Sequence, residues 1–129
     1  MQKLAIEYLQ KTKDKFPEKT ALVDEGQGIT FGQLWRNSLA LAYWINTEFQ
    51  ITNQPISVNL PKSIDAVIAL LGIQLSGNIY VPLNIEIPGK EKILAVLGSN
   101  RVLEHAGGEF RLGGKIFANA PWGYQHKSL

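Results

Sequence analysis

The chain has 129 residues, 45% hydrophobic and 19% charged, so one globular domain or subdomain is the largest unit it can form. It contains no cysteine, which excludes disulfides, thiolate metal sites and a cysteine nucleophile. The net charge of +2 gives no indication of a nucleic-acid partner. No stretch resembles a signal peptide or a membrane span, so we predict a cytoplasmic protein with no membrane contact.

The N-terminal part predicts a helix followed by a hairpin. Apolar residues recur at helical spacing over residues 2–15, and Pro17 follows the end of this helix. Residues 20–24 and 29–31 are extended segments on either side of the glycine-containing turn 25–28. This arrangement predicts a β-hairpin.

A second helix is expected directly after the hairpin. Thr30 and Gln33 have the spacing of a capping box, in which the hydroxyl accepts from a backbone N–H and the amide reaches back. The apolar face then continues to about residue 48. The helix should therefore begin at the capping box and bury that face.

The middle of the chain predicts a strand, a buried helix and a second strand. Residues 56–60 alternate at period two, and Pro61 closes the strand because it cannot donate to a sheet ladder. Ser63 is suited to cap a helix over residues 64–75, which is apolar almost all round. The second strand covers residues 79–83.

The order of these elements predicts an α/β fold. A short helix should follow residue 88 and end near Gly98, and strand-helix-strand units of this kind usually pair their strands in parallel. From residue 98 the pattern changes, since half of the twelve glycines lie in 98–129 without sustained periodicity. We expect this tail to be poorly ordered or a weak hairpin.

Two glycine pairs in the tail invite comparison with a phosphate-binding loop. Gly107-Gly108 and Gly113-Gly114-Lys115 provide glycines and a lysine, but the first glycine of that loop would fall on Glu109. Ile116 also stands where a hydroxyl is required after the lysine. We interpret both pairs as flexible turns.

The other candidate polar residues do not form a catalytic pattern. His105 and His126 lie in the tail without a second ligand at suitable spacing, so we expect solvated side chains. Asp24 and Glu25 are adjacent at a turn, where carboxylates usually point into solvent. We therefore predict no catalytic, cofactor-binding or metal-binding residue in this chain.

Aromatic residues gather at two places. Trp35, Tyr43 and Trp44 share one helix and could form a stacking platform, but no basic stripe accompanies them, which favours packing. The segment 121–124, Pro-Trp-Gly-Tyr, would be an exposed contact patch or a consequence of an unfinished chain.

Two motifs resemble those of the adenylate-forming, AMP-dependent synthetase and ligase family. Residues 16–23, FPEKTALV, and 29–34, ITFGQL, resemble the family's opening stretch, with Phe31 where tyrosine is usual. Residues 76–84, SGNIYVPLN, resemble the family's motif in which Ala-Gly precedes Tyr-Val-Pro-Leu-Asp, with Ser76 for alanine and Asn84 for aspartate. The chain is most similar to nonribosomal peptide synthetase adenylation domains and D-alanine ligases.

The resemblance covers about residues 5–97 and implies an incomplete N-terminal subdomain, with helices on a short, partly parallel sheet. Residues 1–97 would be a partial AMP-binding domain and 98–129 a divergent tail that a frameshift, an early stop or a gene remnant could explain. The family activates a carboxylic or amino acid with ATP and Mg²⁺ and passes it to a thiol. Its phosphate-binding loop and catalytic lysine are not found here, so the resemblance implies a truncated ligase that is inactive alone and needs no cofactor itself.

Two other hypotheses remain open. The chain could be an interaction module, either a split-ligase half that acts with a complementing chain or a fragment that binds through its sheet edge. A small nucleotide-binding domain is the third option. If later parts of the family fold normally cover it, Val67, Leu71 and Leu75 should expose apolar surface here and support self-association.

Overall fold

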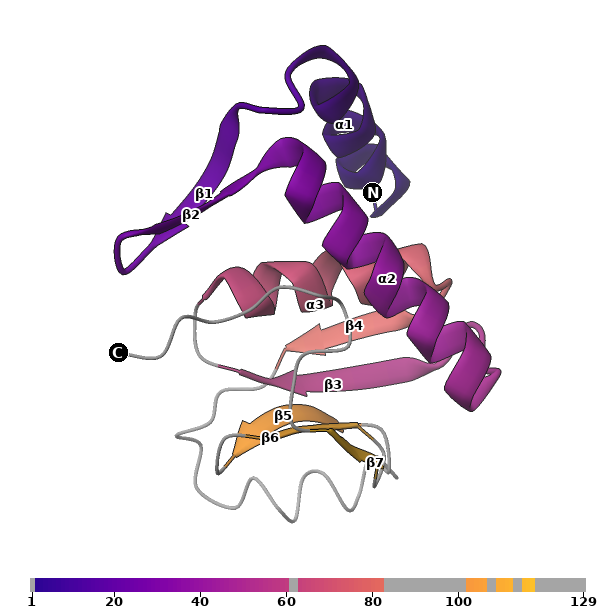
Figure 1. The fold of residues 1–129 in the computed structure, drawn as a ribbon. Coiled ribbons are helices and arrows are strands. Elements are labelled where there is room, and N and C mark those ends of the chain that lie inside the picture. Colours follow the sequence, from indigo (N-terminus) through magenta and orange to yellow (C-terminus); the bar gives the residue numbers. More distant parts are fainter. Residues whose placement is uncertain (1, 61–62, 83–101, 107–108, 113–114, 118–129) are drawn as a thin grey trace.

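The computed structural model describes residues 2–60, 63–82, 102–106, 109–112 and 115–117 (Figure 1). The short helix predicted after residue 88 and the aromatic segment 121–124 lie outside these residues. The elements, in chain order, are α1 Gln2–Lys15, β1 Thr20–Asp24, β2 Gln27–Thr30, α2 Phe31–Phe49, β3 Pro55–Asn59, α3 Ile64–Leu75, β4 Ile79–Pro82, β5 Val102–Ala106, β6 Glu109–Leu112 and β7 Lys115–Phe117.

The predicted elements of the first 82 residues are confirmed. β1 and β2 form the antiparallel hairpin, and α2 begins at the capping box. The Gln33 backbone N–H donates to Thr30 Oγ1 at 3.1 Å, and the Thr30 N–H donates to Gln33 Oε1 at 3.0 Å. These two bonds fix the start of α2, because each satisfies a backbone donor that the helix leaves free.

The sheet follows from a βαβ unit. β3 pairs in parallel with β4 on one side and with β5 on the other, in the order β4-β3-β5-β6-β7. Figure 1 shows α3 lying between α2 and the strands β3 and β4. Val58, Leu103 and Leu112 are paired in register across three strands and are all buried in the same core. These three apolar side chains therefore pack β5 and β6 into the same core as the helices.

The tail is more regular than predicted. The expected alternatives were poor order or a weak hairpin, whereas β5, β6 and β7 form an antiparallel meander that joins the main sheet through β3. The sequence signal was weak because each strand has only three to five residues. Strands this short give one or two inward positions each, too few for a visible period.

Helices α2 and α3 cross at very close range. A Cβ atom added at Gly72 would lie 2.7 Å from Leu41 Cδ2 and 2.9 Å from its Cβ and Cγ. Leu41 is fully buried and Gly72 is buried as well. The glycine therefore allows α2 to approach α3 to a distance that no other residue permits.

Asn78 joins the loop after α2 to the start of β4. Its Nδ2 donates to the Ile51 carbonyl at 3.1 Å and to Ser76 Oγ at 2.9 Å, and its Oδ1 accepts from the Gln54 N–H at 3.0 Å. The side chain is 2% exposed. Ile79 N–H also donates to the Gln54 carbonyl at 2.8 Å, so side chain and backbone hold the two segments together.

Gly72→Ala should destabilise the protein. The added methyl must displace Leu41, at a cost of about 1–3 kcal/mol that exceeds the helix-propensity gain of about 1 kcal/mol. Urea unfolding should show a lower midpoint. Gly28→Ala is the matched control, because its Cβ would meet Thr20 Cγ2 at an ordinary 3.5 Å. If Leu41→Ala does not relieve the penalty of Gly72→Ala, the close crossing is not its cause.

Asn78→Ala should lower the free energy of unfolding by about 2–3 kcal/mol, because the Gln54 N–H and the Ile51 carbonyl lose a buried partner. Asn46→Ala, at an exposed position of α2, should change it by no more than about 0.5 kcal/mol. Equal effects of the two substitutions in urea unfolding would show that Asn78 does not hold these segments together.

Candidate functional site

The carboxyl ends of the parallel strands are the first place to look for a ligand site. The chain passes from β3 to β4 on one side and then returns to β5 on the other, which makes β3 a topological switch point. β3 ends at Asn59, which is 8% exposed and whose Oδ1 has no hydrogen-bond partner. Asn59 is thus a buried acceptor at this edge, but the oxygen itself is covered by protein atoms.

The N-termini of α2 and α3 are each capped by a side-chain hydroxyl. Ser63 Oγ accepts from the Ala66 N–H at 3.2 Å, at the start of α3. Thr30 does the same for Gln33 at the start of α2. A helix end binds phosphate through free backbone N–H groups, and here side chains already occupy part of that role. Each of these two helix ends thus has one backbone donor fewer for an anion.

A metal site is also lacking among the described residues, where no group of three or more His, Asp or Glu side chains could hold an ion. The same residues form no helix that is long and apolar enough to cross a membrane. Magnesium bound with ATP is usually held by one or two carboxylates together with the phosphates and water. The described part of the chain thus shows no cluster of metal ligands.

One surface hollow among the described residues lies between the hairpin and α3. This hairpin groove has a volume of about 210 Å³. Four of its residues are apolar and two are polar, and they come from β1 and from the start of α3: Leu22, Val23, Asp24, Ser63, Ile64 and Val67. Its lining suits an apolar side chain better than a charged ligand.

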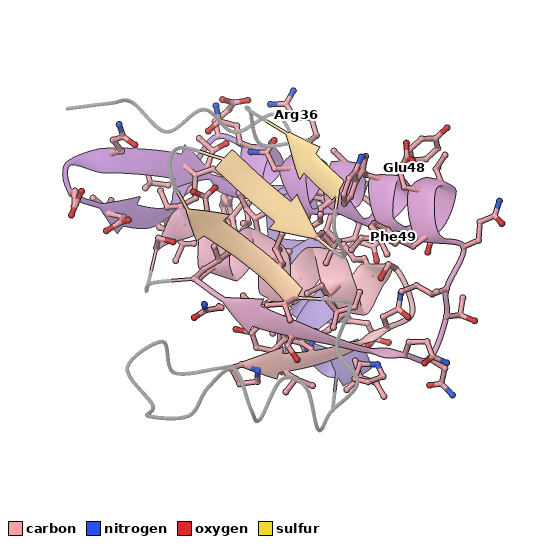
Figure 2. The ribbon with its side chains drawn as sticks, turned by 90° about the horizontal axis from the view of Figure 1, so that it is seen from below. Arg36, Glu48 and Phe49 are labelled. Carbon is pink, nitrogen blue, oxygen red and sulfur yellow. The ribbon has the colours of Figure 1, made fainter. Side chains whose placement is uncertain are left out.

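The second hollow lies between the end of α1 and the start of α2, with a volume of about 300 Å³. Lys13 and Arg36 are its cations, and Trp35 provides an aromatic wall. Lys13 Nζ lies 2.7 Å from Asp14 Oδ1 and 5.4 Å from the Trp35 ring centroid, so its charge is already partnered. Figure 2 shows Arg36 reaching outward from α2. The other polar residues of the lining are Glu18, Thr30 and Gln33, of which the last two form the capping box of α2.

The aromatic residues of α2 do not form a platform. Trp35 and Trp44 are half-buried against the core, and Trp44 makes an edge-to-face contact with Phe49 at 5.4 Å between ring centroids. Tyr43 is 72% exposed and is not among the residues packed against the core. The interpretation as packing is confirmed for both tryptophans. Figure 2 shows Phe49 at the C-terminal end of the helix.

The remaining candidates of the sequence analysis are not brought together. Asp24 ends β1 and borders the hairpin groove, whereas Glu25 is an exposed turn residue with φ of 51°. His105 lies in β5 and Lys115 in β7. His126, Gly107-Gly108 and Gly113-Gly114 lie outside the described residues. No catalytic constellation is visible in the described part of the chain.

The expectation of an exposed apolar stripe on α3 is wrong for Leu71, which is 8% exposed, and Val67 and Leu75 are half-buried. The reason is that α2 packs closely on α3 at Gly72 and the sheet covers another side. The large apolar side chains that are exposed lie elsewhere, at Tyr8, Phe16, Val23, Leu39, Tyr43 and Ile79.

Two residues of the SGNIYVP segment have roles that the motif did not reveal. Asn78, the variable position of the motif, makes the hydrogen bonds described above. Tyr80 packs against the core, and this burial raises the pKa of its phenol above the usual value of about 10. The sequence places an asparagine between a glycine and a strand, which does not by itself predict its partners. Its bond to the Gln54 N–H joins residues 24 positions apart, and such a bond leaves no local sequence pattern.

Comparison with known proteins identifies the family of this arrangement. A sequence model described as AMP-binding enzyme matches residues 9–105. The D-alanine–D-alanyl carrier protein ligase of Bacillus cytotoxicus is 33% identical over 95 residues, covering 74% of this chain and 19% of the ligase. Syringomycin synthase SyrB1 of Pseudomonas syringae is 37% identical over 76 residues, covering 59% and 12%. The chain thus spans about a fifth or less of these curated relatives.

Solved structures share the fold. The N-terminal subdomain of Klebsiella oxytoca NpsA, solved in complex with anthranilyl-AMSN, has a TM-score of 0.68 and 21% identity over 76% of this chain and 26% of its own. O-succinylbenzoate coenzyme A synthetase (MenE) of Bacillus subtilis has a TM-score of 0.69 and 25% identity over 77% and 22%. Since the family match covers most of the chain, the protein belongs to the AMP-binding enzyme family and has part of the N-terminal subdomain fold of an adenylation domain.

Proposed function

We propose that this chain is an N-terminal scaffold segment of an AMP-forming ligase and has no ligase activity alone. The parent enzymes of this proposal activate a carboxylic or amino acid with ATP and Mg²⁺ and pass the acyl group to a thiol. The observation that carries the proposal is the family match over residues 9–105, whose described part holds packed helices and strands, helix ends capped by their own side chains and no group of three or more His, Asp or Glu side chains.

Physical chemistry explains why such a segment cannot catalyse the reaction. Attack of a carboxylate on the α-phosphorus of ATP requires positioned phosphates and stabilisation of the charge that develops on them. Here Thr30 and Ser63 hydroxyls occupy the helix ends, and Lys13 is paired with Asp14. These side chains stabilise the fold, and the family fold alone does not supply an activity.

An amino acid is the substrate class that we favour for the parent enzyme. The support is the relation to D-alanine–D-alanyl carrier protein ligases and to syringomycin synthase SyrB1, at 33% and 37% identity. A cytoplasmic location stays a prediction. The competing hypothesis of a split-ligase half differs in one respect, because it requires a second chain that restores activity.

The isolated chain should show no ATP–pyrophosphate exchange with Mg²⁺ and D-alanine or a panel of other amino acids, because the described helix ends are capped by their own side chains and the described carboxylates form no group of three or more. The full-length Bacillus cytotoxicus ligase serves as the positive control for D-alanine. Cooperative urea unfolding of the same sample verifies that the chain is folded. Exchange above background that depends on both Mg²⁺ and an amino acid would contradict the proposal.

A further inference from the structure

The strands β5, β6 and β7 cover the side of β3 that faces away from β4 (Figure 1). β5 pairs in parallel with β3, whereas β6 and β7 follow in antiparallel order. Only residues 107–108 separate β5 from β6, and a parallel partner would need a connection of about a dozen residues or more. The parallel part of the sheet therefore ends at β5, and β6 occupies its outer edge.

β6 is anchored in the hydrophobic core. Leu103 of β5 and Leu112 of β6 lie opposite each other in the strand register, and they are 0% and 1% exposed. Both belong to the same cluster of buried side chains as Ile68 of α3. Because the full burial of a leucine side chain is strongly favourable, the core holds β6 on β5 in addition to the backbone ladder.

The outermost strands of the described sheet both have features that discourage pairing with another chain. β7 has only three residues and begins with Lys115. β4, at the opposite edge, ends with Pro82, which has no N–H to donate. Very short edge strands, lysine and proline are means by which natural sheets avoid edge-to-edge association. β5 has five residues with neither lysine nor proline, so it would lack this protection without β6.

The family match does not account for β6 and β7. It ends at residue 105, within β5, and both strands follow in the sequence. The two strands nevertheless complete the described sheet on this side. Their role is therefore to be sought in this chain.

We propose that β6 and β7 are a built-in cap, which keeps the edge of β5 from pairing with β5 of a second copy of this chain. Release of β6 would uncover backbone N–H and C=O groups of β5 together with Leu103. An antiparallel pair of two β5 strands about a twofold axis would give each edge an identical partner. The cap goes beyond the proposed function and does not depend on it.

The cap bears on the hypothesis of an interaction module that binds through its sheet edge. Such a module needs an edge strand whose backbone groups are available to a partner strand. In this chain β6 already pairs with that edge of β5, and Leu112 fills the core beneath it. A partner strand would first have to displace β6.

The absence of cysteine from the sequence allows the cap to be locked and released in one molecule. Glu104 and Arg111 are opposite each other in the register of β5 and β6. The Cα atoms of such pairs are about 4.5–5.5 Å apart, which a disulfide can span. The full chain therefore receives Glu104→Cys and Arg111→Cys, together with Leu112→Ala to weaken the anchor of β6. Reduction permits β6 to leave β5, and oxidation prevents it.

Sedimentation equilibrium measures self-association of the reduced and oxidised triple variant, and urea unfolding verifies that both are folded. The reduced form should associate on the order of tenfold more tightly or better, because its β5 edge can open. If Leu112→Ala does not fold, Leu112→Val takes its place, since it removes less of the side chain.

The matched control places the cysteine pair at Asp24 and Gln27, which are opposite each other in the hairpin of β1 and β2, in the same Leu112→Ala chain. Its disulfide locks the hairpin and leaves β6 unrestrained. Reduction of this control should change self-association by no more than about twofold.

Equal self-association of the reduced and oxidised triple variant would overturn the cap, and so would a reduced variant that is folded and monomeric. Failure of the pair at positions 104 and 111 to form an intramolecular disulfide would also overturn it, because β6 would then not lie on β5. None of these results touches the proposed function, whose failure is seen as pyrophosphate exchange by the isolated chain.

Discussion

The close crossing of α2 and α3 at Gly72 is the constraint on which the rest of the structure depends. Because no side chain separates the helices there, α3 can pack against Leu41 and still cover β3 and β4. The sheet then aligns Val58, Leu103 and Leu112 beneath the helices. A larger residue would push α2 away from this core. Asn78 adds a polar restraint at the other end of the βαβ unit.

Local signals in the sequence predicted most of the first 82 residues. The capping box of Thr30 and Gln33 and the N-cap Ser63 are interactions between residues three apart, and they appear as expected. Features that depend on contacts between residues far apart in the sequence could not be predicted in this way. The strands β5 to β7 are too short to show a period, and Leu71 is buried by α2, whose crossing no sequence pattern announces. The hairpin groove forms where β1 contacts the start of α3, and these two segments lie some 40 residues apart along the chain.

The hydrogen bonds and the ion pair of the described side chains hold the fold together. The Ser63 hydroxyl caps a helix, and Lys13 is paired with its neighbouring Asp14. The Asn78 side chain is hydrogen-bonded to the backbone. The buried Asn59 oxygen has no partner, yet protein atoms cover it. The described residues thus have part of the N-terminal subdomain fold of the family.

The central claim is that this chain supplies scaffold and not a nucleotide site. Titration calorimetry of the folded chain with ATP and Mg²⁺ tests it most directly. The account predicts no saturable heat at millimolar nucleotide, because the ends of α2 and α3 are capped by their own side chains and the described carboxylates do not cluster. Stoichiometric binding of ATP that requires Mg²⁺ would contradict it.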